Sequence, residues 1–397
     1  MQKICVIGLG YIGLPTASLL ATKGFDVLGV DVRAEVVEKL NRGEIHIVEP
    51  GLDILVKSAV HSGNFKASLT PTLADIFILA VPTPFHEDKT PDISYVEAAT
   101  RSIAPFLREG NLVILESTSP VGTTEQVQKI IATLRPELKK LYFAHCPERV
   151  IPGKVLQELI ENDRVVGGVD AEATEKTVAF YRSFVAGKVL ATDAKTAEMC
   201  KLTENAFRDV NIAFANELSL ICDKLNINVW ELIRLANDHP RVKILQPGPG
   251  VGGHCIAVDP WFIVASAPEV SPLLRTAREV NDGKPEWVIA KVTAAAAKIK
   301  NPIIACLGVA FKADIDDLRE SPSLMIAERL RDANIGQVLV CEPNIQQLKG
   351  FELVSLEAAL TRADIILILV DHRSFKQLSR KQLLDKIVID TKGILNS

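Results

Sequence analysis

Cys255 lies in a glycine-rich stretch, Gly-Pro-Gly-Val-Gly-Gly-His-Cys-Ile-Ala-Val-Asp, at residues 248–259. A thiolate is a strong nucleophile, and the N–H groups of a glycine loop favour the thiolate form. The alternative is a buried structural thiol, which is the commoner fate of a cysteine. Cys5, Cys306 and Cys341 lie inside apolar runs and fit that alternative. The glycines imply backbone that a substrate can approach closely, so we interpret Cys255 as a covalent nucleophile.

A second glycine pattern, Gly-Leu-Gly-Tyr-Ile-Gly, follows an apolar run at the N-terminus and precedes a helical pattern. Such a loop brings the backbone and a helix N-terminus close to a pyrophosphate. Asp31 follows the next apolar run, where a carboxylate binds the ribose hydroxyls of a dinucleotide. Because a carboxylate there repels the 2′-phosphate of NADP, Asp31 favours NAD. Arg33, two residues later, weakens that preference. A glycine turn without a ligand is the alternative. The candidate cofactor contacts of this loop are Gly8, Gly10, Tyr11, Ile12 and Gly13.

Two threonines follow the next two predicted strands of this first block. Thr83 lies in Val-Pro-Thr-Pro and Thr118 in Glu-Ser-Thr-Ser-Pro-Val-Gly. Ligands bind outside the carboxyl ends of parallel strands, so both side chains are expected to face the cofactor. The alternative is turn chemistry, in which a hydroxyl satisfies backbone groups beside proline.

Lys201, Asn205 and Arg208 form one stripe of a predicted helix over 196–225. A solvated helix face is the alternative, but small and apolar residues continue the stripe, which favours a partly buried polar cluster. A lysine there can stabilise a developing alkoxide or exchange its proton.

The pairs His145-Cys146 and His254-Cys255 do not predict a zinc site. Adjacent ligands on an extended chain point to opposite sides, and no two cysteines have the spacing of a structural zinc site. We therefore expect no metal.

The elements that must position these residues follow an α/β pattern. Apolar runs at 4–7, 27–30, 76–81 and 112–116 alternate with amphipathic stretches, which predicts a parallel sheet covered on both faces. A weaker copy begins after residue 300, with runs at 303–307, 338–341, 363–370 and 387–389. The sequence thus predicts two Rossmann-like doubly wound domains, 1–195 and 301–397, joined by a helical connector, 196–300. Within the connector we expect helices over 196–225 and 285–299. The longer helix is the expected contact surface of a dimer.

The chain has 397 residues and a formal net charge of −4. That charge excludes the basic surface typical of nucleic-acid binders. The longest apolar runs are too short to cross a bilayer, and no signal peptide fits the N-terminus. Seven cysteines without a pairing pattern indicate a reducing compartment, so we expect a cytoplasmic protein.

Several motifs together resemble the UDP-glucose/GDP-mannose dehydrogenase family. They are the N-terminal glycine loop, Glu-Ser-Thr-Ser-Pro-Val-Gly (116–122), Cys-Pro-Glu-Arg (146–149), Cys-Lys-Leu-Thr-Glu-Asn-Ala-Phe-Arg (200–208), Gly-Gly-His-Cys-Ile-Ala-Val-Asp (252–259) and Ala-Phe-Lys-Ala-Asp-Ile-Asp-Asp-Leu-Arg-Glu-Ser-Pro (310–322). The match covers essentially the whole chain in order. Residues 43–50, residues 236–242 and Ala257 resemble the members that oxidise UDP-N-acetyl-D-mannosamine.

The resemblance implies a four-electron oxidation of the sugar C6 alcohol to a uronate with two NAD⁺, for bacterial surface polysaccharide. Cys255 matches the nucleophile that forms a thiohemiacetal and then a thioester, and Lys201 matches the proton donor and acceptor. Asn205, Asp259, Glu148 and Thr118 match supporting groups, and Arg319 matches a cofactor contact. The residues that match substrate contacts are Arg149, Val150, Lys201, Asn205, Arg208, His239, Arg241, Gly252 and Lys312. His239 and Arg241 would cross from the partner of an obligate homodimer.

Pro152 departs from the family pattern, because UDP-glucose dehydrogenases carry a glutamate there. The base for thioester hydrolysis is therefore open between Glu148, Asp259 and an oriented water. The sugar is open as well, since the same chemistry could act on UDP-N-acetylglucosamine, UDP-glucose or GDP-mannose. A non-catalytic sensor of NAD and sugar nucleotide is a further hypothesis. A 2-hydroxyacid or 6-phosphogluconate-type dehydrogenase would leave Cys255 without a role.

Overall fold

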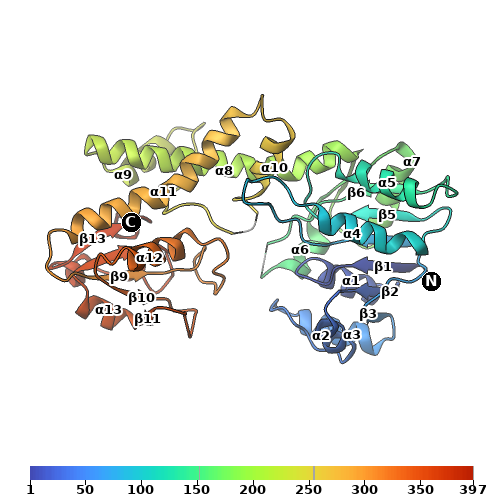
Figure 1. Cartoon of the computed structure of the whole chain (residues 1–397), viewed down its shortest axis with the longest axis horizontal. Coiled ribbons are helices and arrows are strands. Elements are labelled where there is room, and N and C mark those ends of the chain that lie inside the picture. Colours follow the sequence, from blue (N-terminus) through green and yellow to red (C-terminus); the bar gives the residue numbers. More distant parts are fainter. Residues whose placement is uncertain (152, 254, 397) are drawn as a thin grey trace. The chain divides into compact units, whose positions relative to one another are not determined.

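The computed structural model describes residues 1–151, 153–253 and 255–396, and the chain divides into two compact units (Figure 1). The first unit comprises residues 1–204 with 265–267, and the second comprises 205–264 with the chain from 268 onward. The long helix α8 (Ala194–Leu225) and the shorter α10 (Asp259–Ser266) carry residues of both units. The boundaries of the three expected domains remain predictions.

The first unit is built on one sheet in the order β3-β2-β1-β4-β5-β6-β7-β8. Its strands pair in parallel except for β6 and β7, which are antiparallel. The strand order reverses at β1, so the carboxyl ends of β1 and β4 form the switch point where ligands of such sheets bind. The strands are β1 (Lys3–Ile7), β2 (Asp26–Val30), β3 (Phe65–Ser68), β4 (Ile76–Leu79), β5 (Leu112–Leu115), β6 (Tyr142–His145), β7 (Arg164–Gly168) and β8 (Val189–Asp193).

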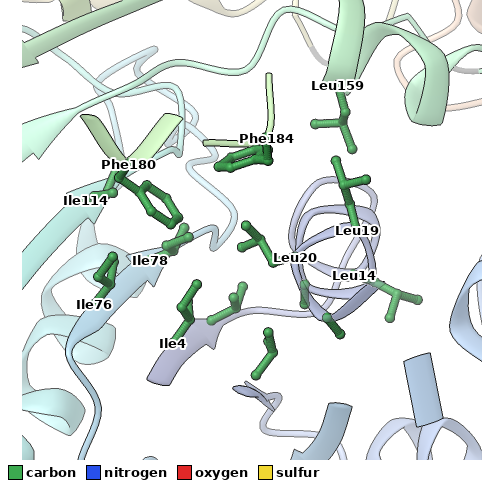
Figure 2. Close-up of a cluster of buried hydrophobic side chains, with 14 of the residues drawn as sticks. Ile4, Leu14, Leu19, Leu20, Ile76, Ile78, Ile114, Leu159, Phe180 and Phe184 are labelled. Atoms are coloured by element: carbon green, nitrogen blue, oxygen red, sulfur yellow. The ribbon is translucent and has the colours of Figure 1, made fainter. Parts of the chain in front are cut away.

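Alternate residues of each buried strand point to opposite sides of this sheet, so both faces are apolar and both are covered by helices. Ile4 and Val6 of β1 enter one hydrophobic cluster, and Cys5 and Ile7 enter the other. Figure 2 shows the first cluster, in which side chains of β1, β4 and α1 meet those of α6 and α7. The helices are α1 (Gly13–Thr22), α2 (Ala34–Asn41), α3 (Leu52–His61), α4 (Ser94–Ile103), η1 (Ala104–Phe106), α5 (Thr123–Leu134), α6 (Val155–Glu161) and α7 (Ala171–Arg182).

The second unit contains a parallel sheet in the order β11-β10-β9-β12-β13. Its two faces bury separate apolar clusters, one of which is covered by α11 and α12. The strands are β9 (Ile303–Leu307), β10 (Gln337–Cys341), β11 (Glu352–Leu353), β12 (Ile365–Ile368) and β13 (Ile387–Asp390). The helices are α9 (Val229–Asn237), α11 (Pro272–Ala296), α12 (Pro322–Asp332), α13 (Leu356–Arg362), η2 (Arg380–Leu383) and η3 (Ile394–Asn396).

The two Rossmann-like sheets and the long α8 confirm the expected fold class. The predicted helix over 285–299 is wrong at its start, because α11 begins thirteen residues earlier and contains Pro285 in its interior. Proline is favoured in a first helical turn, so its position was a misleading start signal. No disulfide links any of the seven cysteines, which all belong to the described residues. Among the described residues, no helix is both long and apolar enough to span a bilayer.

Candidate functional site

The N-terminal glycine loop has room for a ligand above Gly10. Gly8 has φ +92°, a conformation that favours glycine. A Cβ at Gly13 would lie 1.8 Å from the Gly8 carbonyl oxygen, so helix α1 packs against the loop only without a side chain there. A Cβ at Gly10 would meet no atom within 4 Å. Tyr11 is exposed and Ile12 half-buried beside this opening. The loop therefore leaves space where a pyrophosphate approaches backbone.

Asp31 stands directly after β2 with a buried carboxylate. It accepts hydrogen bonds from Leu9 N (3.2 Å), Arg33 N (3.0 Å) and Arg33 Nε (3.2 Å). Burial alone raises the pKa of Asp31, but these hydrogen bonds outweigh it and hold the pKa below its ordinary value. The carboxylate is thus kept charged beside the glycine loop, which fits a bound ribose, and it engages the Arg33 guanidinium.

The structure brings Thr83 and Thr118 together. The Thr83 hydroxyl donates to the Thr118 carbonyl oxygen at 2.5 Å, and the Ser117 hydroxyl donates to Val81 O at 2.7 Å. Both threonines follow strands next to the switch point, β4 and β5, as the sequence predicts. The hydroxyl of Thr83 makes a turn contact of the kind expected beside proline, and Thr118 is half-buried.

Glu198, which the sequence analysis missed, fixes the loop after Thr118. Its buried carboxylate on α8 accepts from Gly122 N at 2.6 Å and from Thr124 N at 2.7 Å, at the start of α5. Burial raises the pKa of Glu198 despite these bonds. The contact spans 76 residues of sequence, so no local pattern announces it.

Glu148 belongs to a buried ion pair with Arg164 of β7, at 2.5 Å. Its other oxygen accepts from Arg149 N at 2.7 Å. The Arg149 guanidinium in turn donates to Glu204 of α8 at 2.7 Å. Both carboxylate oxygens of Glu148 are therefore occupied by donors. Val150 is half-buried beside them, and Pro152 lies outside the described residues.

Cys255 is half-buried at the entrance to α10. Its carbonyl oxygen accepts from Val258 N and Asp259 N, at 3.0 and 2.9 Å. The buried carboxylate of Asp259 accepts from the Asn205 amide of α8 at 2.5 Å. Three of the predicted residues are thus linked within the second unit. His254 lies outside the described residues.

Three of the glycines before Cys255 pack closely on other parts of the second unit, and the expected approach of substrate remains a prediction. A Cβ at Gly252 would lie 2.5 Å from Glu320 O, and one at Gly250 would lie 2.8 Å from Pro322 Cβ. Gly253, at φ +80°, would place a Cβ 3.0 Å from the Phe311 ring. The loop thus packs closely on the segment 311–322. Glycine is required there by protein packing.

The remaining candidates divide between the units. Lys201, half-buried on α8, belongs to the first unit. The basic candidates of the second unit are exposed: Arg208, His239, Arg241, Lys312 and Arg319. Nη2 of the Arg319 guanidinium donates a hydrogen bond to the Asp317 carboxylate at 2.6 Å. The described residues contain no group of three or more histidine, cysteine or acidic side chains that could hold a metal ion.

Several proteins similar to this chain are named as dehydrogenases of nucleotide sugars. Family models named for the UDP-glucose/GDP-mannose dehydrogenase family match as NAD binding domain at residues 2–185, central domain at 195–283 and UDP binding domain at 305–397. The NDP-N-acetyl-D-galactosaminuronic acid dehydrogenase of Ralstonia nicotianae is 57% identical, over 99% of this chain and 96% of its own.

Two further similar proteins carry another name. The UDP-N-acetyl-D-mannosamine dehydrogenase of Yersinia pestis is 54% identical over 99% of both chains. The structure of the UDP-N-acetyl-mannosamine dehydrogenase from S. aureus superimposes with a TM-score of 0.90 at 44% identity, covering 100% of this chain and 96% of its own.

Proposed function

This chain belongs to the UDP-glucose/GDP-mannose dehydrogenase family and is an NAD-dependent oxidoreductase, and on that premise we propose that it oxidises C6 of UDP-N-acetyl-D-mannosamine to the uronate. The observation that carries the proposal is Cys255 at a closely packed loop, linked through Asp259 to Asn205. An enzyme that carries oxidation past the aldehyde benefits from a thiol, because the thiol traps the aldehyde for the second hydride transfer.

The substrate class is supported by the names of the similar proteins. UDP-N-acetyl-D-mannosamine dehydrogenases of several bacteria are 54–55% identical to this chain. The 57% identity to an NDP-N-acetyl-D-galactosaminuronic acid dehydrogenase favours a second candidate, the galacto-configured sugar nucleotide. Both candidates carry an N-acetyl group.

The proposed chemistry uses the chain's own groups in sequence. The loop Gly8–Gly13 and Asp31 would hold NAD, which would supply the hydride acceptor for oxidation of the C6 alkoxide to the aldehyde and, as a second NAD, for oxidation of the thiohemiacetal. Lys201 takes the proton of the C6 hydroxyl and stabilises the alkoxide. The Cys255 thiolate then adds to the aldehyde carbon as a thiohemiacetal, whose oxidation leaves a thioester that water hydrolyses to the carboxylate. Asp259 and Asn205 hold each other in the active orientation.

Glu148 is assigned to orienting water. Its two oxygens already accept from Arg164 and from Arg149 N, so the carboxylate is fixed where it lies. Thr118 is proposed to hold the same water. The Arg149 guanidinium, which donates to Glu204, is proposed to bind the substrate as well.

We also propose a homodimer through α8. Phe207, Phe214, Ile221 and Leu225 are 69, 54, 44 and 59% exposed. Their spacing places them on one stripe of the helix, and an exposed apolar stripe of this kind is typical of an association surface. His239 and Arg241, exposed after α9, would then reach the partner's substrate.

The proposed setting is the bacterial cytoplasm, where the uronate would serve surface-polysaccharide synthesis. The absence of disulfides among seven cysteines supports a reducing compartment.

A panel of sugar nucleotides tests this function, with NADH counted per mole and compared by kcat/KM. We expect two NADH per UDP-N-acetyl-D-mannosamine, with an acid product. A higher kcat/KM for the N-acetyl-galactosamine nucleotide would transfer the assignment to the second candidate. Binding without NADH from any member would instead revive the sensor hypothesis.

A further inference from the structure

A buried chain of polar side chains in the second unit leads to the loop that carries Cys255. Arg278 of α11 donates to the Asp209 carboxylate at 2.6 Å, and the Asn281 amide donates to the same carboxylate at 2.8 Å. The Asn216 amide donates to Asn281 Oδ1 at 2.8 Å, and Gly248 N donates to Asn216 Oδ1 at 2.8 Å. All four side chains are buried.

The Asp209 carboxylate determines which group donates and which accepts in every following hydrogen bond of this series. The Asp209 carboxylate only accepts hydrogen bonds, so Asn281 must present its NH₂ group to it. The Asn281 oxygen then faces Asn216, which must present its own NH₂ group. That orientation leaves the Asn216 oxygen for Gly248 N. A single amide rotation would leave unmatched donors or acceptors in a buried place, which costs more than a hydrogen bond contributes.

The same helix holds the loop at both ends. Asn216 binds its start at Gly248, and Asn205 binds its end at Asp259. These two asparagines are eleven residues apart, which places them about 16 Å apart along α8 and within about 20° of one face. Between the anchors, Gly250 and Gly252 pack against Pro322. The loop is thus stretched along α8 and pressed on the segment 311–322.

We propose that Asn216 is a positioning residue for Cys255, oriented by Asn281, Asp209 and Arg278. The proposal rests on the proposed function only for the role of Cys255 as nucleophile. A loop released at Gly248 leaves Cys255 displaced from its productive position and more open to solvent. A displacement of about 1 Å can cost about 10²-fold in rate.

The test compares Asn216→Leu, which keeps the size but neither hydrogen bond, with the parent enzyme. We expect kcat to fall by about 10- to 100-fold while the Kd for NAD is unchanged. Iodoacetamide labelling, followed by peptide mass spectrometry, should show the rate at Cys255 relative to Cys200 rising by about tenfold. Cys200, also half-buried, serves as the reference within the same chain.

Ser219→Ala is the matched control. Ser219 is a buried polar residue of α8 one turn beyond Asn216. Its hydroxyl donates to the Asn216 carbonyl oxygen and accepts from the buried Lys284 ammonium, and it does not bind the loop. This variant should keep the parent labelling ratio. Asn281→Ala, which breaks the next link, carries the same test with a smaller expected effect if Asn216→Leu does not fold.

A folded variant with parent kcat, or with a labelling ratio within about twofold of the parent or below it, overturns the positioning role. Failure of the proposed function looks different, because the parent enzyme would then produce no NADH or Cys255→Ser would turn over normally. The labelling ratio in the Asn216 variants would still report whether the loop moved.

Discussion

Cys255 differs from the other cysteines in its surroundings. Burial raises the pKa of Cys5, Cys146 and Cys306 to about 12, which keeps them as inert thiols at neutral pH. Cys255 is half-buried at the entrance to α10. Cys200 is also half-buried, so the proposed reactive role of Cys255 rests on its motif and its position before Asp259.

Cys255→Ser should lower turnover by about 10³-fold or more, because a hydroxyl is a far weaker nucleophile toward the aldehyde. NAD affinity should be unchanged. NADH production measured at saturating substrate checks the first expectation, and calorimetric titration with NAD checks the second. Cys200→Ser is the control, since Cys200 is the other half-buried cysteine, and it should stay active. Normal turnover by Cys255→Ser would remove the covalent mechanism.

Glu116, at the end of β5, is a buried carboxyl group whose environment disfavours its charge. Burial, with help from the Glu148 charge, raises its pKa to about 7, although Arg164 and the Tyr181 hydroxyl oppose the shift. The folded protein therefore retains a proton that the unfolded chain loses above its ordinary pKa. Stability falls as pH rises through that window up to about 7.

Glu116→Gln should remove this dependence, because glutamine keeps the acceptor for Tyr181 without a titrating group. The variant should be more stable than the parent above pH about 7, by on the order of 1–3 kcal/mol, and should match it in acid. Melting temperatures from pH 4 to 9 provide the measurement. The control is Glu175→Gln on the exposed face of α7. A parallel shift at every pH would show that Glu116 does not titrate as described.

At the scale of elements, α8 is the scaffold on which the candidate residues depend. Glu198 holds the loop after Thr118, Asn205 holds Asp259, and Asn216 holds Gly248. The opposite side of the same helix presents the exposed apolar stripe. One long helix thus holds the loop after Thr118 and both ends of the loop 248–259, and it carries the stripe of the proposed dimer.

Phe214→Asp should dissociate the proposed homodimer, because a carboxylate would be buried without a partner in the middle of the stripe. Sedimentation velocity at micromolar concentration should show a shift from dimer to monomer. Activity should fall with it, since His239 and Arg241 would no longer reach a neighbouring substrate. Leu384→Asp is the control, because Leu384 is 76% exposed and belongs to the end of η2 and not to α8. An unchanged sedimentation coefficient for Phe214→Asp would place any dimer interface elsewhere.

At the scale of the whole molecule, the sequence predicts the buried strands best. The apolar runs that form β1, β4, β5, β9 and β12 are long enough to be predicted as strands from the sequence alone. β3 (Phe-Lys-Ala-Ser) and the two-residue β11 are short and mixed in composition, so no periodicity marks them. The antiparallel contact of β6 with β7 depends on tertiary pairing, which local pattern does not specify.

Candidate site residues could be predicted where they belong to recognisable sequence motifs. Asp31, Thr83 and Thr118 follow strands that the sequence reveals, and the structure places them at the expected sheet edge. Glu198, Arg164 and Asn216 were missed, because each acts through a partner 76, 16 or 32 residues away. Such pairings are decided by how helices and loops pack, and one sequence carries no periodic signal for them.

The most direct measurement is mass spectrometry of the enzyme quenched with acid during turnover of UDP-N-acetyl-D-mannosamine and NAD. The account predicts a sugar-nucleotide adduct on the peptide that contains Cys255, present during turnover and absent when NAD is withheld. Acid product formed at two NADH per sugar with no adduct on that peptide, or release of free aldehyde after one NADH, would contradict it.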